Sequence, residues 1–212
     1  MIDIINENLF HLTTSETSYV FTVGNNGELL HLYYGSRIDV TANGRNALIQ
    51  KWSHGNACSV VSDEAEHRLC PDDEKFEMGT LGKGDLRTPA VEILWNNGGT
   101  TSEFIFESAE ILDIKDVSAL YKKSHLPHSY DDNGEKNALK VVLKEKTEDV
   151  RMNLYYCIFE DSNVITRSAE IVNCSAEEFA IRSLSSLQLD LDADVCKVTS
   201  FHGDWAREME KC

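Results

Sequence analysis

The sequence predicts an all-β protein built as an antiparallel sandwich. Apolar side chains alternate with a period of two residues along most of the 212-residue chain, which places them on one face of an extended strand. Polar turn motifs lie between the alternating runs, and no stretch of 12 or more residues keeps the apolar stripe of an amphipathic helix. With 42% hydrophobic residues, the chain is long enough to bury a real core.

The clearest strand is predicted at residues 150–159, where Val150, Met152 and Leu154 share one face. A polar loop at 160–163 separates it from a second predicted strand at 164–173. Residues 179–192 continue the pattern, with leucines alternating against polar side chains. We expect three consecutive antiparallel strands, the first of them in a layered sheet.

Further strands are predicted on both sides of two turn motifs. Asn25-Asn26-Gly27 and Asn96-Asn97-Gly98-Gly99 have the residues that tight hairpins need. The strands predicted around them and farther along the chain are residues 9–12, 18–23, 29–34, 90–95, 103–114 and 138–143. Residues 45–51 can form a short helical turn.

The segment from residue 44 to residue 87 interrupts this pattern, because it lacks alternation and is rich in charge. Loops of this length are usually functional or disordered. Two interpretations remain open: a solvated excursion, or a loop that packs on another domain or subunit.

Charge and composition exclude several classes of function. The net charge of −16 repels phosphate backbones and anionic lipids, so we expect neither a nucleic-acid nor a membrane partner. The start of the chain lacks the basic and apolar blocks of a secretory signal, which predicts a cytoplasmic protein. The six cysteines contain no C-x-x-C pair, and we expect free thiols.

Local motifs for catalysis or for cofactor and metal binding fail on spacing. The glycine-rich run 79–84 has Glu77 where a phosphate-binding loop needs its first glycine. The aspartates at 190–194 are followed by Val195 where a calcium loop needs glycine, so we expect them to face solvent from a strand. His125 and His128 lack a third ligand at a recognisable spacing. The sequence therefore predicts no catalytic residue, no metal site and no cofactor.

The densest group of functional residue types is the run 202–208, which contains Trp205, Arg207 and Glu208. An aromatic ring beside charges can bind sugar hydroxyls. The alternative is structural: Trp205 anchors the core or an interface, while Arg207 and Glu208 pair with or cap neighbouring backbone.

Several segments, in order along the chain, together resemble the N-terminal domain of glycoside hydrolase family 36, the bacterial and fungal α-galactosidases of the melibiase and raffinose-hydrolysing type. The segments that carry the resemblance are 10–12, 17–20, 30–35, 82–90, Leu126-Pro127 with Tyr130, 163–168 with Asn173, and 201–209. The resemblance implies a galactose-mutarotase-like β-supersandwich that precedes a (β/α)8 barrel.

In such enzymes two barrel aspartates give retaining hydrolysis of terminal α-galactosyl bonds. Residues 1–212 correspond to an incomplete N-terminal sandwich without that barrel, so the resemblance implies a chain that is inactive alone.

The resemblance also implies a homo-oligomer, often a tetramer, in which an N-terminal loop reaches a neighbouring subunit's pocket. The charged segment 52–77 occupies the corresponding region, and within it Asp63 and Arg68 are candidate sugar-binding residues. Asp85 and Arg87 match the family pattern, where they either fix the turn into the strand at Ala90 or contribute to an interface. The functions left open are an α-galactosidase fragment that acts in oligomerisation and at the pocket rim, and a free-standing carbohydrate-binding or assembly module.

Overall fold

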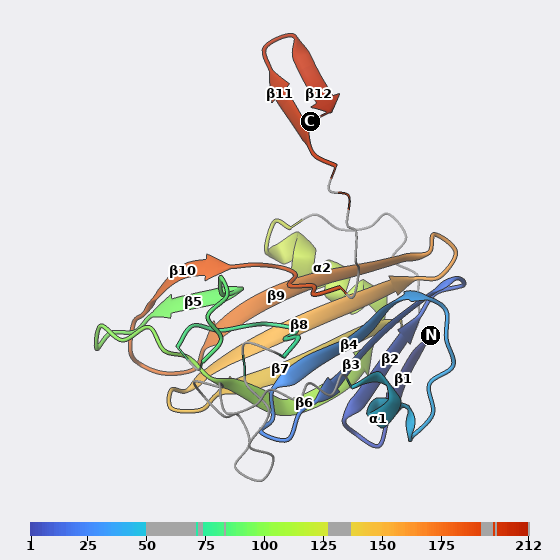
Figure 1. Cartoon of the computed structure of the whole chain (residues 1–212). Helices are drawn as coiled ribbons and strands as arrows, with labels where there is room; N and C mark the ends of the chain where they lie inside the picture. The colour runs from blue at the N-terminus through green and yellow to red at the C-terminus, as the bar shows by residue number, and fades with distance from the viewer. Residues whose placement is uncertain are drawn as a thin grey trace.

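The computed structural model describes residues 1–49, 71, 74–82, 84–126, 137–191, 197 and 199–211, and it confirms the antiparallel β-sandwich. Two four-stranded sheets form its layers, with strand orders β1-β2-β3-β4 and β6-β7-β8-β9. Every pairing between named strands is antiparallel. Figure 1 shows the first sheet, in blue, lying against the second, in yellow and orange.

The first sheet is a run of consecutive hairpins. Its strands are β1 (Ile2–Ile5), β2 (Leu9–Thr13), β3 (Thr17–Val23) and β4 (Leu29–Ser36). The last three confirm predicted strands, whereas β1 was not predicted. Its four residues are too few to show alternation, and it pairs with β2 across a turn in which Asn6 and Glu7 have positive φ.

The second sheet contains the longest strands, and all four were predicted. They are β6 (Phe104–Leu112), β7 (Ala138–Glu145), β8 (Val150–Phe159) and β9 (Val164–Asn173). The register of β8 and β9 runs without a bulge from the Val150↔Asn173 pair to the Phe159↔Val164 pair. Asn163 has φ 54°, a left-handed conformation that asparagine tolerates, in the turn that joins them.

The core lies between the two sheets and is rich in aromatic rings. Phe21 of β3 stacks on Phe10 of β2 with centroids 4.7 Å apart, and on Tyr156 of β8 at 5.0 Å. The alternating residues Val150, Met152, Leu154, Tyr156 and Ile158 are all buried, as their period predicts. The contact between Phe21 and Tyr156 joins the layers directly.

Two short strands and two helices complete the sandwich. β5 (Val91–Leu94) pairs with β10 (Ala180–Leu184), and α1 spans Gly44–Leu48. The hairpin that the turn motif at 96–99 predicts is therefore wrong, because β5 and β6 lie in different sheets. α2 (Ile114–Lys123) follows β6, where the predicted strand 103–114 extends too far. It packs Ile114, Val117 and Tyr121 against the second sheet, but its ten residues are too short to show a sustained stripe. Neither described helix reaches the length and apolar character of a membrane span.

The prediction of a strand over 179–192 is wrong beyond Leu184. The prediction of three consecutive antiparallel strands over 150–192 holds only for β8 and β9, because β10 pairs with β5. Residues 185–191 form no strand. Instead, the Gln188 side-chain oxygen accepts a hydrogen bond from the Gly79 amide at 2.6 Å, and Asp190 pairs with Arg87 at 2.9 Å. These contacts explain why leucine alternation there does not produce a strand, and why Asp190 is not simply solvent-facing.

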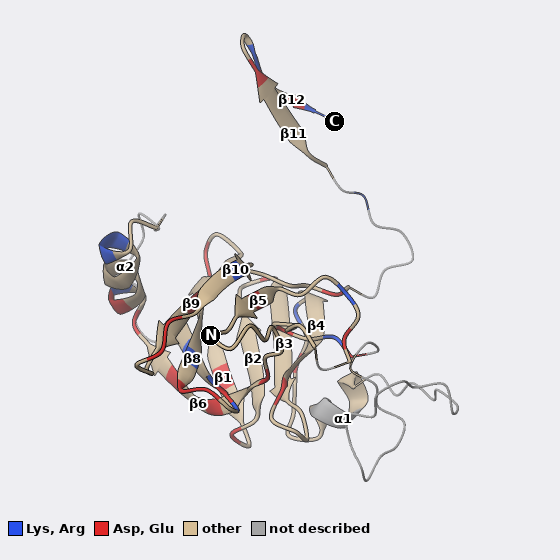
Figure 2. Ribbon diagram, turned by 90° about the vertical axis from the view of Figure 1, so that its left-hand side faces the viewer, with Lys and Arg blue, Asp and Glu red and all other residues tan. Residues whose placement is uncertain are grey.

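A hairpin that was not predicted ends the described chain. It consists of β11 (Phe201–Asp204) and β12 (Arg207–Lys211), and all of its residues are exposed. Figures 1 and 2 show it standing apart from the two sheets.

The described cysteines carry free thiols, as the sequence predicts. Cys157 is buried and Cys174 is exposed; the other four lie outside the described residues. Burial raises the pKa of the Cys157 thiol to about 11, so that thiol stays protonated at neutral pH.

Replacing Gly27 by alanine tests the packing of the turn between β3 and β4. Gly27 has φ +89°, and a Cβ there lies 3.1 Å from Ile105 Cβ. We expect Gly27→Ala to lower the free energy of unfolding by about 1–2 kcal/mol, measured by urea denaturation. The matched control is Gly98→Ala, because Gly98 has φ +82° and open space around it. Equal losses in both variants would contradict the contact with Ile105.

Candidate functional site

A carboxylate lies at the centre of the sandwich, surrounded by four polar side chains. Glu77 is 0% exposed. The Tyr19 hydroxyl lies 2.8 Å from Oε1, and the Tyr156 hydroxyl donates to Oε2 at 2.7 Å. His31 Nδ1 is 3.0 Å from Oε1, and the Arg167 guanidinium is 3.4 Å from Oε2. We call these five residues the Glu77 cluster.

Four strands and one connecting segment position the cluster. Tyr19 and His31 come from β3 and β4 of the first sheet, while Tyr156 and Arg167 come from β8 and β9 of the second. Glu77 is held beside β4, because the His31 amide donates to Lys75 O at 2.6 Å. The Glu77 amide donates to Leu29 O at 2.9 Å. The carboxylate therefore bridges two layers that share no strand.

Electrostatics keep Glu77 ionised in spite of its burial. Desolvation opposes the charge, but the Arg167 cation and the hydrogen bonds from His31 and Tyr156 outweigh it and hold the pKa of Glu77 below its ordinary value. Burial, together with the nearby carboxylate, raises the pKa of both Tyr19 and Tyr156 well above 10. Both phenols therefore remain hydrogen-bond donors at neutral pH.

Arg167 extends the cluster to neighbouring backbone. Its Nη2 donates to Glu77 O at 2.8 Å, its Nη1 lies 3.4 Å from Gln188 O, and its guanidinium carbon lies 5.2 Å from the Tyr156 ring centroid. The Arg167 Nε is buried with no hydrogen-bond partner in the described part of the chain. Through these contacts Arg167 connects the segments around Glu77 and Gln188 to β9. The arginine thus stabilises the fold.

The sequence does not predict this cluster. Of its five residues, only Tyr156 is predicted to be buried, on the apolar face of the strand at 150–159. One local signal exists: Glu77 stands between the apolar residues Phe76 and Met78 in a stretch that is otherwise strongly charged. Its partners lie far from it along the chain, with Arg167 ninety residues away. Nothing in the local sequence could pair them.

The predicted candidates Asp85 and Arg87 do lie together. Arg87 Nε donates to Asp85 Oδ1 at 2.8 Å, and Nη1 donates to Asp190 at 2.9 Å. Arg87 Nη2 also donates to Glu74 O at 2.6 Å. Hydrogen bonding to Asp85 raises the pKa of Arg87 above its ordinary value. These contacts fasten the turn before β5, while an interface role for the pair stays a prediction.

The other candidates do not join a common site. Trp205, Arg207 and Glu208 lie on the β11–β12 hairpin, where Trp205 is 93% exposed. Trp205 is therefore no core residue of this chain, and its role at an interface stays a prediction. Asp63 and Arg68 lie outside the described residues, as does His128. Among the residues that the structure describes, no three His, Cys, Asp or Glu side chains are grouped to hold a metal ion.

These features define a class of protein domain: an antiparallel β-sandwich whose most prominent polar cluster is buried and structural. The chain belongs to a known family of such domains, because residues 27–211 match the family described as "Glycosyl hydrolase family 36 N-terminal domain". The resemblance drawn from the sequence is thereby confirmed.

The relatives are α-galactosidases. The chain is 30% identical over 203 residues to the bifunctional alpha-galactosidase/sucrose kinase AgaSK of Mediterraneibacter gnavus, covering 96% of this chain and 21% of that protein. The α-galactosidase structure from Lactobacillus brevis superposes with a TM-score of 0.83 at 29% identity, covering 99% of this chain and 28% of that one. A variant of Geobacillus stearothermophilus AgaA in complex with stachyose superposes at 0.71 with 25% identity, covering 84% and 24%. The chain thus spans between 21% and 28% of the length of these relatives.

Replacing Glu77 by glutamine tests whether the buried carboxylate is ionised. The substitution leaves Arg167 without its counter-charge, so at pH 7 we expect a loss of about 3–5 kcal/mol in the free energy of unfolding. Because the pKa of Glu77 is lowered by folding, its contribution is present above about pH 4.5 and is lost as the pH falls through the folded-state value. Urea denaturation at pH 7 and below pH 4.5 measures the free energy of unfolding of the original chain and of Glu77→Gln. We expect the difference between the two values to be smaller at the lower pH.

The control for that experiment is Glu107→Gln. Glu107 also bonds an arginine, Arg151, at 2.8 Å, but on the exposed surface. Solvent screens that pair, so the control should unfold nearly as the original chain does at pH 7. A Glu77→Gln protein as stable as this control would show that the cluster does not stabilise the sandwich.

Proposed function

We propose that this chain forms the N-terminal, non-catalytic part of an α-galactosidase that hydrolyses terminal α-galactosyl residues with retention. The observation that carries the proposal is the family match over residues 27–211, joined to relatives that are α-galactosidases several times longer than this chain. The stachyose complex of AgaA supports α-galactosyl oligosaccharides of the melibiose and raffinose type as the substrate class.

In this proposal the catalytic carboxylates lie in a separate barrel, and residues 1–212 are a partial sandwich with no turnover of its own. The burial of Glu77 excludes that carboxylate as a reacting group, since a side chain that is 0% exposed cannot reach a glycosidic bond. Retention requires two carboxyl groups about 5–5.5 Å apart on either side of that bond.

The sandwich would act in oligomerisation and at the rim of a substrate pocket. Asp63 and Arg68 would contact the sugar bound by a neighbouring subunit, through the charged segment 52–77. This role is supported by the contacts at the C-terminal end of segment 52–77. Glu77 is buried in the core, and Arg87 Nη2 donates a hydrogen bond to Glu74 O at 2.6 Å. We further propose a cytoplasmic homo-oligomer, with a tetramer as the expected form.

Hydrolysis of a chromogenic α-galactoside tests where catalysis lies. We expect no turnover by the purified 212-residue chain, and turnover by a longer protein that continues the same reading frame into a barrel. The product formed by the longer protein, followed by NMR of its anomeric proton, should first have the α configuration. Turnover by the short chain would place the reacting carboxylates within these residues and overturn the proposal.

The exposed hairpin generates a separate prediction about self-association. Phe201, Trp205 and Met209 are 58%, 93% and 76% exposed, an unusual density of apolar surface on eleven residues. We expect the 212-residue chain to aggregate more readily than a longer protein that covers the hairpin, and Trp205→Ser to reduce the aggregation in sedimentation velocity. The control is Leu86→Ser, which changes an 81% exposed leucine outside the hairpin. An equal effect of both substitutions would count against an interface at the hairpin.

A further inference from the structure

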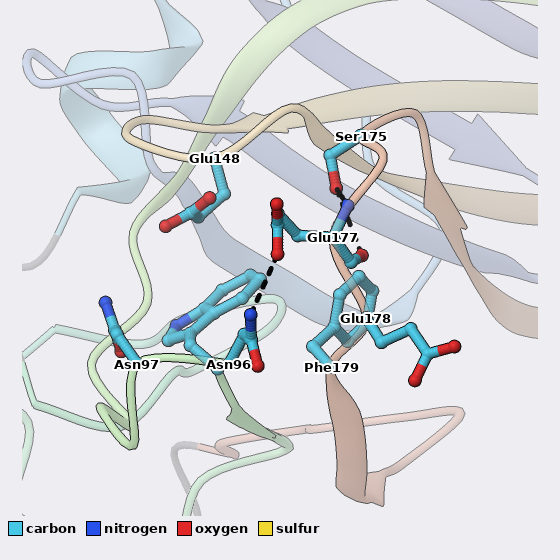
Figure 3. A pocket seen from close by; sticks show the side chains of 8 residues that line it. Asn96, Asn97, Glu148, Ser175, Glu177, Glu178 and Phe179 are labelled. Atoms are coloured by element: carbon cyan, nitrogen blue, oxygen red, sulfur yellow. Dashed lines mark hydrogen bonds between the residues drawn. The ribbon is translucent and has the colours of Figure 1, made fainter.

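A cavity of about 240 Å³ opens at one end of the sandwich, where three loops meet. The loops follow β5, join β7 to β8, and join β9 to β10. Figure 3 shows it from close by. The residues that line it are Trp95, Asn96, Asn97, Glu148, Ser175, Glu177, Glu178 and Phe179. Asn96 and Asn97 belong to the turn after β5, and Trp95 also packs in the core between the sheets.

Two aromatic rings give the cavity an apolar wall. Trp95 and Phe179 meet edge to face with centroids 5.2 Å apart. The indole nitrogen of Trp95 donates to Thr101 O at 2.8 Å. Because this hydrogen bond satisfies the only polar atom of the indole, the part of the ring that lines the cavity is carbon surface. The rest of the ring packs in the core, and Trp95 is 7% exposed in all.

Amides and carboxylates surround that wall. Asn96 Nδ2 donates to Glu177 Oε2 at 2.8 Å, and Asn97 Oδ1 accepts from the Gly99 amide at 2.8 Å. In Figure 3 the carboxylates of Glu148 and Glu177 lie on the cavity side, whereas the carboxylate of Glu178 points away. The Asn97 amide nitrogen lies on the side of Glu148.

Hydrogen bonds within the β7–β8 and β9–β10 loops order these loops in the absence of a ligand. The Glu145 carboxylate, only 2% exposed, accepts from the backbone amides of Thr147 and Glu148 at 2.5 and 2.6 Å. Asn173 Nδ2 donates to Glu177 O at 2.8 Å. A site whose loops are already ordered loses little conformational entropy on binding.

The lining chemistry selects the class of ligand. Carboxylates line the cavity, and no lysine or arginine is among the lining residues that the structure describes, so this lining disfavours anions. Carboxylates and carboxamides accept from hydroxyl groups, carboxamides also donate to them, and an aromatic wall covers the C–H face of a sugar ring. The volume lies below the range of about 300–1,000 Å³ typical of drug-sized ligands, which limits the occupant to a small group.

We infer that this cavity binds one ring of a neutral saccharide. Glu148 and Glu177 accept from its hydroxyls, and Trp95 and Phe179 contact its apolar face. The inference goes beyond the proposed function and does not depend on it, because a sugar can bind here whether or not a barrel follows.

The test uses the indole N–H signals of the 212-residue chain in ¹⁵N-correlated NMR, with galactose, glucose and melibiose as probes. The chain has three tryptophans, so Trp52→Phe and Trp205→Phe assign the Trp95 signal by elimination. We expect at least one probe to shift the Trp95 signal saturably in the millimolar range, with the Trp205 signal unchanged. Glu148→Gln and Glu177→Gln should each raise the apparent Kd roughly tenfold or more, whereas Glu178→Gln, the matched control, should change it less than twofold.

Other outcomes would overturn the inference. Absence of a saturable Trp95 shift with all three sugars would remove the site. A saturable shift with choline or calcium ion but not with sugars would make it a cation site. Equal weakening by Glu178→Gln and Glu177→Gln would place the sugar elsewhere. Thermal melting of each variant checks that its fold is intact, and the hydrolysis assay above is unaffected by any of these results.

Discussion

The mutual position of the two sheets depends on the buried carboxylate of Glu77 and the side chains that bind it. The desolvation free energy of an isolated carboxylate in a protein core far exceeds the free energy gained from packing it. The chain around Glu77 therefore supplies hydrogen bonds and an opposite charge. The strands β3, β4, β8 and β9 each provide one such group. A shift of one residue in any of these strands would turn the donor to the opposite face. The carboxylate therefore constrains both sheets to one register and one mutual position.

This constraint explains the outer parts of the molecule as well. Segment 74–80 lies between β4 and the second sheet. Its backbone bonds to Leu29 and His31 of β4, and Glu77 contacts Tyr156 and Arg167 of the second sheet. Arg87 then secures the same segment from outside through Glu74 O and Asp190. The Gln188 side chain holds Gly79 and displaces the strand that leucine alternation alone would favour. The polar contacts here override the intrinsic strand pattern.

The sheets could be predicted from the sequence because their determinants are local. Alternation of apolar and polar residues indicates burial of one face, so seven of the eight strands in the two sheets follow from neighbouring residues, as do β5 and the start of β10. Strand pairing is less local: the turn at 25–27 joins a true hairpin, whereas the strands on either side of 96–99 pair with other partners. The short strand β1 and the ten-residue helix α2 lack enough periods to be visible. The Glu77 cluster joins residues 46 to 90 positions apart, which no local pattern encodes. Family membership followed from several weak segments in a shared order, whereas Asp63 and Arg68 rest on that resemblance alone.

The strand order has a consequence for the synthesis of the chain. Because the first sheet is a meander of consecutive hairpins, all of its strands have left the ribosome once Ser36 has emerged. Phe106 of β6 covers the ring of Phe10, but the ring of Phe21 gains its partner Tyr156 only when β8 arrives, which ends at Phe159. At about 5–20 residues per second, that delay is on the order of ten seconds. Throughout it, the nascent chain presents an uncovered aromatic surface, which is the kind of surface that chaperones bind.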